Sequence, residues 1–227
     1  MTAAEAGGVL PVDKPAGPTS HDVVGMARRA LETRRVGHTG TLDPFATGLL
    51  LLCVGPATRL SEYLTGLDKT YEATALLGTR TETEDAEGAV VSRDDRWKAL
   101  EPSEVRDAVA AMVGPMAQVP PAFSAKKVAG EAAHRRARRG ESFTLEAVVV
   151  EVYAAELLEV ALPEIRFRVR CSSGTYVRAL ARDLGESLGT GAHLTALRRT
   201  RVGAFPVDGA LPPPALEDPA AVSAAWI

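Results

Sequence analysis

Long hydrophobic runs are missing from this 227-residue sequence, where no apolar stretch exceeds the six residues of 49–54. Because a transmembrane helix needs about 20 consecutive apolar residues, the sequence predicts no membrane span. Residues 1–5 also lack the basic start and apolar core of a secretory signal peptide. We therefore expect a cytoplasmic protein with no membrane partner.

Cysteine is scarce, with only Cys53 and Cys171, and both lie in apolar stretches. Two cysteines are too few for a disulfide framework or a zinc site, so we expect buried free thiols in a reducing compartment. Internal repeats and low-complexity tracts are also absent. The 46% hydrophobic and 24% charged content is that of an ordinary globular protein, and the length suits one large domain.

An excess of positive charge is missing too, since the formal net charge is −3. The charge is nevertheless uneven: residues 126–140 carry six bases against Glu131 alone, and residues 82–87 carry four acids and no base. A chain that is acidic overall can still hold a polyanion on such a basic cluster. A solvated helix face is the alternative explanation for either cluster.

The hydrophobic pattern indicates an α+β domain with a mixed sheet. Helical spacing predicts helices over residues 20–33, with Ser20 as N-cap, and over 102–112. Residues 70–77 alternate as a strand does, with Tyr71 and Leu77 on one face. Residues 148–158 and 165–171 form the clearest strand pair, and residues 193–202 read as a further strand.

The stretch over residues 37–48, Gly-His-Thr-Gly-Thr-Leu-Asp-Pro-Phe-Ala-Thr-Gly, is the most prescribed part of the chain. Asp43 is the only carboxylate between Thr33 and Ser61. Glycines on both sides permit unusual backbone angles, and Pro44 pushes Asp43 toward extended geometry. On pattern alone, a positioned reactive acid and an ordinary Asp-Pro turn are equally good interpretations.

This stretch resembles the signature of the TruB family of tRNA pseudouridine synthases, which isomerise uridine 55 in the T arm. Further matching blocks keep the family order along most of the chain, at residues 12–17, 69–73, 124–127, 171–178, 191–194 and 197–199. The resemblance implies the pseudouridine synthase fold, a long mixed and largely antiparallel sheet flanked by helices and loops. It also implies an RNA-modifying isomerase that needs no cofactor and no metal.

The domain organisation that the resemblance implies has three parts. A disordered N-terminus is expected over residues 1–7 and the catalytic domain over residues 8–210. Residues 211–227 are expected to be a C-terminal tail, at the place where the family usually continues with an RNA-binding PUA domain. Weaker tRNA binding than in a longer relative is then expected, with the chemistry retained.

Three residues are implied to be catalytic. Asp43 matches the family's catalytic carboxylate, which either attacks C1′ or removes the 2′ proton to give a glycal; the sequence leaves both routes open. Tyr71 matches the ring that stacks on the uracil and is a candidate for the C5 proton transfer. Arg178 stands at a predicted helix start, where a cation is unfavourable, so we expect a bidentate pair with Asp43.

Further residues are implied to bind the substrate. The family places His38 in the gap left by the flipped uridine, and Tyr176 and Leu197 in the base pocket. Without the resemblance, His38 would be a loop residue capping a carbonyl, and Tyr71 and Leu197 would be ordinary core. Lys14 is expected to support the Asp43 loop or a phosphate.

The expected partner is tRNA. The protein itself is expected to be a monomer with no obligate protein partner. Bases that are candidates for phosphate contacts are Lys126, Lys127, Arg135, Arg136, Arg138, Arg139, Arg198 and Arg199. Phe123 and His134 depart from the family, which has tyrosines there. Two other functions stay open: a guide-dependent synthase acting on another RNA, and an RNA-binding module without catalysis.

Overall fold

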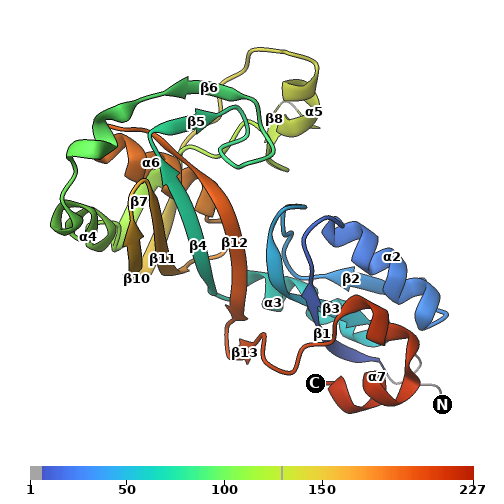
Figure 1. Cartoon of the computed structure of the whole chain (residues 1–227). Helices are drawn as coiled ribbons and strands as arrows, with labels where there is room; N and C mark the ends of the chain where they lie inside the picture. Colours follow the sequence, from blue (N-terminus) through green and yellow to red (C-terminus); the bar gives the residue numbers. More distant parts are fainter. Residues whose placement is uncertain (1–6, 129) are drawn as a thin grey trace. The chain divides into compact units, whose positions relative to one another are not determined.

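The computed structural model describes residues 7–128 and 130–227, so the segment 1–7 that is predicted to be disordered lies outside the described residues except for Gly7. The chain divides into two compact units (Figure 1). Unit 1 comprises residues 1–72 and 197–227, and unit 2 comprises residues 73–196. Strands β4 (Lys69–Leu77) and β12 (Ala192–Val202) each run through both units.

Unit 1 is built on a sheet with the strand order β1–β3–β12–β4, and β2 also pairs with β3. β3 runs parallel to β12 and antiparallel to β1 and β2, so the sheet is mixed as predicted. The remaining elements of unit 1 are β1 (Gly8–Lys14), α2 (Ser20–Ala30), β2 (Val36–His38), β3 (Thr47–Val54), the 3-10 helix η1 (Gly55–Leu60), α3 (Ser61–Gly66), β13 (Phe205–Pro206), η3 (Pro213–Glu217) and α7 (Pro219–Ala225).

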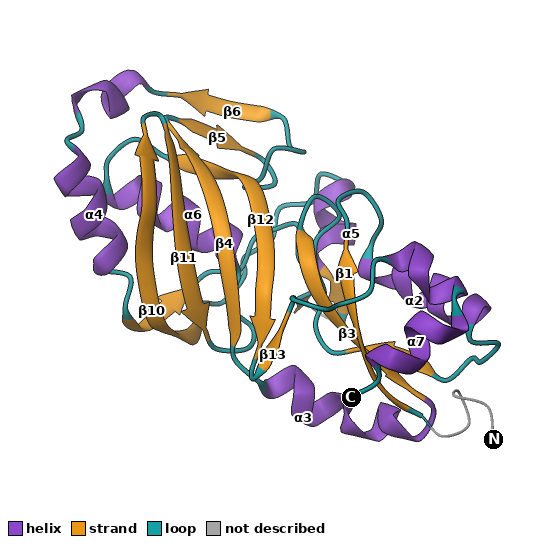
Figure 2. Ribbon diagram, turned by 60° about the horizontal axis from the view of Figure 1, so that its bottom comes forward, coloured by secondary structure: helices purple, strands orange, loops and turns teal. Residues whose placement is uncertain are grey.

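The apolar run over residues 49–54 becomes β3 and is buried on both faces. Leu50 and Leu52 lie in a core cluster with α2 and α7, and Leu49 and Leu51 lie in a second cluster with Val202 of β12. Figure 2 shows α2 and α7 together beside β1 and β3. A strand covered on both sides has no polar face to alternate with, which explains the uninterrupted run.

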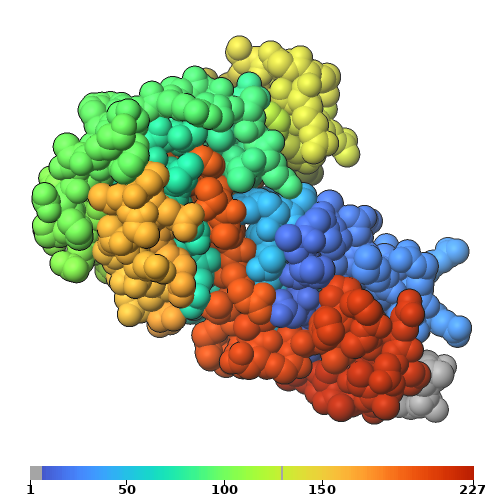
Figure 3. All heavy atoms as spheres, in the orientation of Figure 1, coloured from blue at the N-terminus to red at the C-terminus, as the bar shows by residue number. Residues whose placement is uncertain are grey.

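Residues 211–227, for which the sequence predicts a tail, form η3 and α7 and bury Leu216 and Val222 against α2. Leu211 exchanges backbone hydrogen bonds with β1 through Pro11 and Asp13. In the space-filling view the C-terminal segment, in red, covers the N-terminal segment of the same unit, in blue (Figure 3). These residues therefore contribute to the core of unit 1.

Helix α2 begins differently from the sequence prediction. Its N-cap is Thr19 rather than Ser20: the Thr19 hydroxyl accepts the backbone N–H of Asp22, and the Asp22 carboxylate accepts the N–H of Thr19. This reciprocal capping box satisfies two donors of the first turn. The prediction was wrong by one residue, because the hydroxyl of Ser20 is used outside the helix.

Unit 2 has the strand order β12–β4–β11–β10–β7. β10 is antiparallel to both of its neighbours, which confirms the predicted pairing of residues 148–158 with 165–171. The remaining elements are β5 (Thr79–Thr81), β6 (Val90–Arg93), η2 (Asp95–Ala99), α4 (Pro102–Ala110), β7 (Gly114–Gln118), β8 (Lys127–Val128), β9 (Glu131–Ala132), α5 (Ala133–Arg138), β10 (Val148–Ala161), β11 (Glu164–Cys171) and α6 (Val177–Ser187).

The core of unit 2 follows the sequence pattern. Alternate residues of β11 from Ile165 to Cys171 are buried, and α6 buries Leu180 and Leu184. Cys53 and Cys171 are both buried and neither forms a disulfide, as predicted. Among the described residues, no helix is both long and apolar enough to cross a membrane.

Candidate functional site

Asp43 lies in the loop that joins β2 to β3 in unit 1, and both of its chain neighbours are held in place. The hydroxyl of Ser20, at the start of α2, accepts the Leu42 N–H at 2.8 Å and donates to the Leu42 carbonyl at 3.0 Å. On the other side, the Pro44 carbonyl accepts the backbone N–H of Gly17 at 2.9 Å. The backbone of Asp43 is therefore fixed at both ends, while its side chain is only partly buried.

Lys14 supports the same loop from the end of β1. Its ammonium donates to the carbonyls of Pro44, Pro18 and Pro15 at 3.1, 2.8 and 2.8 Å, and the side chain is fully buried. Burying an ammonium is costly unless it is hydrogen-bonded, and these carbonyls satisfy its three donors. Lys14 thus joins two proline-rich turns beneath Asp43.

Arg199 supports the loop from β12 and is only 2% exposed. Its guanidinium donates to the carbonyls of Leu49 at 2.7 Å, Gly40 at 3.0 Å and Thr41 at 3.4 Å. A cation enclosed in this way is not available to an RNA phosphate. The predicted backbone contact of Arg199 is therefore corrected to an internal role in shaping the loop.

Gly48 allows β12 to approach the loop closely. Its φ is +104°, and a Cβ there would lie 2.2 Å from the carbonyl oxygen of Arg199. A side chain at this position would push apart the parallel pairing of Gly48 with Arg199. The last glycine of the motif is thus required for the contact that brings Arg199 under the loop.

His38 ends β2, just before the loop. Its Nδ1 accepts the backbone N–H of Gly40 at 3.4 Å, so it does not cap a carbonyl as the alternative interpretation supposed. Burial, followed by the positive charges of Arg199 and His21, lowers the pKa of His38. The imidazole is therefore neutral at pH 7, which suits a ring that stacks on bases.

Tyr71 and Leu197 lie on the neighbouring strands β4 and β12 of unit 1. They are 8% and 7% exposed, respectively. The Leu197 carbonyl accepts the hydroxyl of Thr47 at 3.5 Å, which links this strand to the end of the Asp43 loop. Unit 1 therefore holds five of the seven residues predicted to be catalytic or to bind the substrate: Lys14, His38, Asp43, Tyr71 and Leu197.

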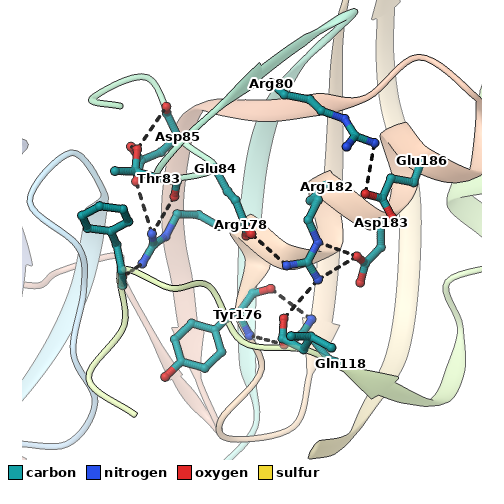
Figure 4. A network of polar contacts seen from close by, with 12 residues as sticks. Arg80, Thr83, Glu84, Asp85, Gln118, Tyr176, Arg178, Arg182, Asp183 and Glu186 are labelled. Atoms are coloured by element: carbon teal, nitrogen blue, oxygen red, sulfur yellow. Dashed lines mark hydrogen bonds and ion pairs between the residues drawn. The ribbon is translucent and has the colours of Figure 1, made fainter. Parts of the chain in front are cut away.

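Arg178 lies in the first turn of α6 in unit 2, where the sequence predicted a helix start (Figure 4). It is 4% exposed and donates to the carbonyls of Thr83 at 2.8 Å and Phe123 at 2.9 Å. The carboxylate of Asp85 lies 3.5 Å from its Nη1. These acceptors offset the cost of a buried cation near the positive end of a helix.

The acidic segment over residues 82–87 is partly internal, and sequence analysis missed this. Asp85 is 3% exposed and accepts the N–H of Glu87, and Glu84 forms an ion pair with Arg182 of α6 at 2.8 Å. Figure 4 shows both acids directed toward α6. A run of acids is normally solvated, so nothing in the local sequence marks Glu84 and Asp85 as buried.

Tyr176 is the N-cap of α6 and is held by a residue that the sequence analysis did not single out. The side-chain amide of Gln118, from the end of β7, bonds both the N–H and the carbonyl of Tyr176. The Tyr176 ring is partly exposed, so the backbone is fixed while the ring can still contact a ligand.

The basic stretch over residues 126–139 contains some bases that form ion pairs and others that are exposed. The Arg139 guanidinium forms a bidentate pair with Glu131 at 2.7 and 2.8 Å and also contacts Glu141, which accepts from Arg136 as well. Lys126, Lys127, Arg135 and Arg138 are exposed. In unit 1, Arg198 forms a bidentate pair with Asp13.

Phe123 and His134, which stand where the family has tyrosines, both take part in hydrogen bonds in unit 2. Phe123 offers its carbonyl to Arg178, so its missing hydroxyl does not affect this contact. The Nδ1 and the backbone N–H of His134 both lie 3.0 Å from the Ser124 carbonyl. The pairing of Asp43 with Arg178 stays a prediction.

Two family models match consecutive parts of the chain. A model described as the N-terminal domain of the TruB family pseudouridylate synthases matches residues 28–177. A second, described as the tRNA pseudouridylate synthase B C-terminal domain, matches residues 178–222. Together they cover both units.

Curated relatives are similar over most of the chain. A tRNA pseudouridine synthase B from Arthrobacter sp. is 53% identical over 209 residues, which cover 89% of this chain and 68% of the relative. A protein of the same name from Opitutus terrae is 49% identical over 213 residues, which cover 94% of this chain and 88% of the relative.

Solved structures share the fold. A chain in an archaeal box H/ACA sRNP Nop10–Cbf5 complex superposes with a TM-score of 0.69 at 30% identity. A chain in a Cbf5–Nop10–Gar1 complex gives a TM-score of 0.70 at 28% identity. The matches cover 93% and 92% of this chain, which spans about half the length of those chains, 53% of each.

Proposed function

This chain belongs to the TruB family of pseudouridylate synthases, and from that premise we propose that it converts uridine 55 in the T arm of tRNA to pseudouridine with Asp43 as the catalytic carboxylate. The predicted pseudouridine synthase fold is confirmed by the likeness to the Cbf5 structures. The chain is thus an RNA-modifying enzyme of the isomerase class.

The observation that carries the proposal is the immobilised backbone around Asp43. Ser20 holds Leu42, and Lys14 with Gly17 holds Pro44, so the carboxylate projects from a loop with little freedom. An ordinary Asp-Pro turn would not require a fully buried lysine and a buried arginine beneath it. Such preorganisation is what positional catalysis demands, because a misplaced group loses rate steeply.

The reaction is an isomerisation that neither adds nor removes atoms. The uridine flips out of the RNA, and its N1–C1′ bond breaks with Asp43 acting at the sugar, by attack on C1′ or by removal of the 2′ proton. The freed uracil turns and C5 bonds to C1′, which either displaces Asp43 from C1′ or is accompanied by return of the 2′ proton. The C5 proton then leaves, and N1 gains a proton. Retention of the base favours a site that excludes water, since an ordinary glycoside hydrolase uses a second carboxylate and a water.

The base pocket is proposed to be formed by the residues that the family resemblance assigns to it. The ring of Tyr71 stacks on the uracil, a contact worth about 1–3 kcal/mol. Tyr176 and Leu197 line the same pocket, and Arg178 pairs with Asp43 to keep the carboxylate ionised. The neutral ring of His38 fills the place that the flipped uridine leaves, which offsets part of the cost of unstacking.

The basic stretch is proposed to bind the RNA backbone. Its exposed bases Lys126, Lys127, Arg135 and Arg138 are available to phosphates, whereas Arg136 and Arg139 must first leave Glu131 and Glu141. Arg198 would similarly leave Asp13. Binding then weakens as salt rises. We further propose that the protein acts as a monomer in the cytoplasm without a protein partner.

The test incubates the chain with unmodified tRNA and maps pseudouridine by carbodiimide-based sequencing. The expected product is a single modified position in the T loop. Asp43→Asn should lose about 10³-fold or more of the rate while it still binds RNA, because phosphate contacts dominate affinity. Asp107→Asn, at an exposed acid on α4, is the matched control and should leave the rate unchanged.

Other outcomes would contradict the proposal. Modification at another position would favour a synthase with a different RNA target. Intact RNA binding without any product from the wild type would favour an RNA-binding module, as would equal function of wild type and Asp43→Asn in an RNA-folding assay.

A further inference from the structure

Gln118 is a fully buried polar side chain at the end of β7, in unit 2. Its Nε2 donates to the Tyr176 carbonyl at 3.1 Å, and its Oε1 accepts the Tyr176 N–H at 2.8 Å. Figure 4 shows the carboxamide facing the Tyr176 backbone with both bonds drawn. A planar amide in this geometry reproduces the two hydrogen bonds that a neighbouring strand gives to one residue.

The backbone of Tyr176, at the start of α6, depends on its contact with Gln118. Tyr176 has an extended backbone, with φ −97° and ψ 110°, and no side chain caps α6 at this residue. Its carbonyl also accepts the N–H of Leu180, so the Gln118 contact sets the direction of the helix's first bond. Without the amide, the Tyr176 N–H would lose its partner and the Tyr176 carbonyl would keep only the Leu180 N–H.

The segment over residues 118–123, which begins with Gln118, contacts α6 at two more points. Arg182 donates to the carbonyl of Val119 at 3.0 Å, and Arg178 donates to the carbonyl of Phe123 at 2.9 Å. These arginines come from α6, whereas Gln118 reaches α6 from the segment. Gln118 is therefore the contact that acts on Tyr176 itself.

We propose that Gln118 is a positioning residue for pseudouridine formation, fixing the backbone of Tyr176 so that its ring is presented to the flipped uracil. The inference rests on the proposed function, because that function places Tyr176 in the base pocket. Gln118 does not contact the substrate in this scheme. It acts through Tyr176, and through the start of α6 that carries Arg178.

The main test compares two isosteric variants. Gln118→Met keeps the shape and removes both hydrogen bonds, while Gln118→Glu replaces the donor with an oxygen that faces the Tyr176 carbonyl. Both should lower the single-turnover rate on a T-arm RNA by about 10- to 100-fold, since a displacement of about 1 Å costs this much. The Kd for the RNA should stay within about twofold, because phosphate contacts set it.

Val150→Ala is the matched control for loss of stability. Val150 is buried on β10, beside β7, and contributes only to packing. It should lower Tm by an amount similar to Gln118→Met and leave the single-turnover rate within twofold of wild type at the assay temperature. An equal loss of rate in Val150→Ala, or a wild-type rate in Gln118→Met, would overturn the proposal.

Amide hydrogen exchange supplies a readout that does not depend on activity. Exchange at the Tyr176 N–H should accelerate at least tenfold in Gln118→Met and stay at the wild-type rate in Val150→Ala. Unchanged exchange in Gln118→Met would refute the positioning. If the wild type forms no pseudouridine, the proposed function fails, and this measurement still decides whether Gln118 holds Tyr176.

Discussion

The loop around Asp43 in unit 1 and the start of α6 in unit 2 are immobilised by different means. The loop has no regular structure of its own, so side chains from β1, α2 and β12 hold its backbone: Lys14, Ser20 and Arg199. The start of α6 is already regular. There, outside acceptors hold the helix's own side chains, as Thr83 and Asp85 do for Arg178, and the Gln118 side chain adds a hold on the backbone of the N-cap Tyr176.

This difference shows how each kind of segment obtains rigidity. A loop has unpaired backbone groups at many positions, so donors on side chains must reach them one by one. A helix satisfies most of its backbone internally, so a few contacts at its first turn fix its orientation. We therefore expect substitutions in unit 1 to lower stability most at the residues that hold the loop. In unit 2 we expect the effects at residues that form ion pairs.

The largest effect on stability is expected for Arg199→Met. The change leaves three carbonyls of the loop without their charged donor, and bonds to charged groups contribute about 1.5–3 kcal/mol each. We expect a loss of more than about 3 kcal/mol in the free energy of unfolding, measured in urea, and a large loss of single-turnover rate.

Arg198→Met is the neighbouring control for this variant. Arg198 is a partly exposed ion-pair residue with a side chain 41% exposed, so its removal should cost no more than about 1 kcal/mol. Equal stability losses in the two variants would contradict the assignment of Arg199 to the loop.

An intermediate effect is expected for Ser20→Ala. This change deprives both backbone groups of Leu42 of their partner and should cost about 1–3 kcal/mol. Thr19→Ala removes the N-cap of the same helix and should cost about 1 kcal/mol, without touching the loop. Only Ser20→Ala should also slow single-turnover pseudouridine formation. A similar slowing in Thr19→Ala would show that helix stability alone controls the rate.

The smallest effect, in unit 2, is a pH dependence at Glu84. Burial, opposed by the charge of Arg182, raises the pKa of Glu84. A raised pKa means that the folded state prefers the protonated acid. The stability that protonated Glu84 contributes is therefore fully present below the pKa of the unfolded chain. It is lost as pH rises through the folded pKa. Glu84→Gln should therefore gain stability relative to wild type between about pH 4 and pH 7.

Urea unfolding at the two pH values measures this difference. Glu82→Gln removes the same charge from an exposed neighbouring position and should show no comparable change between the two pH values. A parallel pH dependence in the two variants would assign the effect to net charge rather than to the buried pair.

Local patterns in the sequence were enough to predict much of the fold. The alternation around Tyr71 and the pair β10–β11 appear where the pattern places them. The loop with Asp43 stood out because its glycines permit backbone angles that other residues avoid and its proline restricts Asp43. The resemblance, rather than periodicity, supplied the topology of the sheet.

The supporting contacts of the site could not be predicted in the same way. Arg199 looked like a surface base and Asp85 like part of a solvated acidic run, yet both are buried. Gln118 carried no signal at all. Each of these side chains bonds groups that are distant in sequence or enclosed by distant segments, so no local period contains the information.

The sequence by itself therefore determined most of the elements and the order of the motifs, because patterns of burial and turn residues are expressed among neighbouring residues. The tertiary structure decided which side chains hold those motifs. Ser20 meets Leu42 across 22 positions, Gln118 meets Tyr176 across 58, and Arg199 meets Gly40 across 159. A hydrogen bond needs its two atoms about 3 Å apart, and only the folded chain brings such distant positions that close.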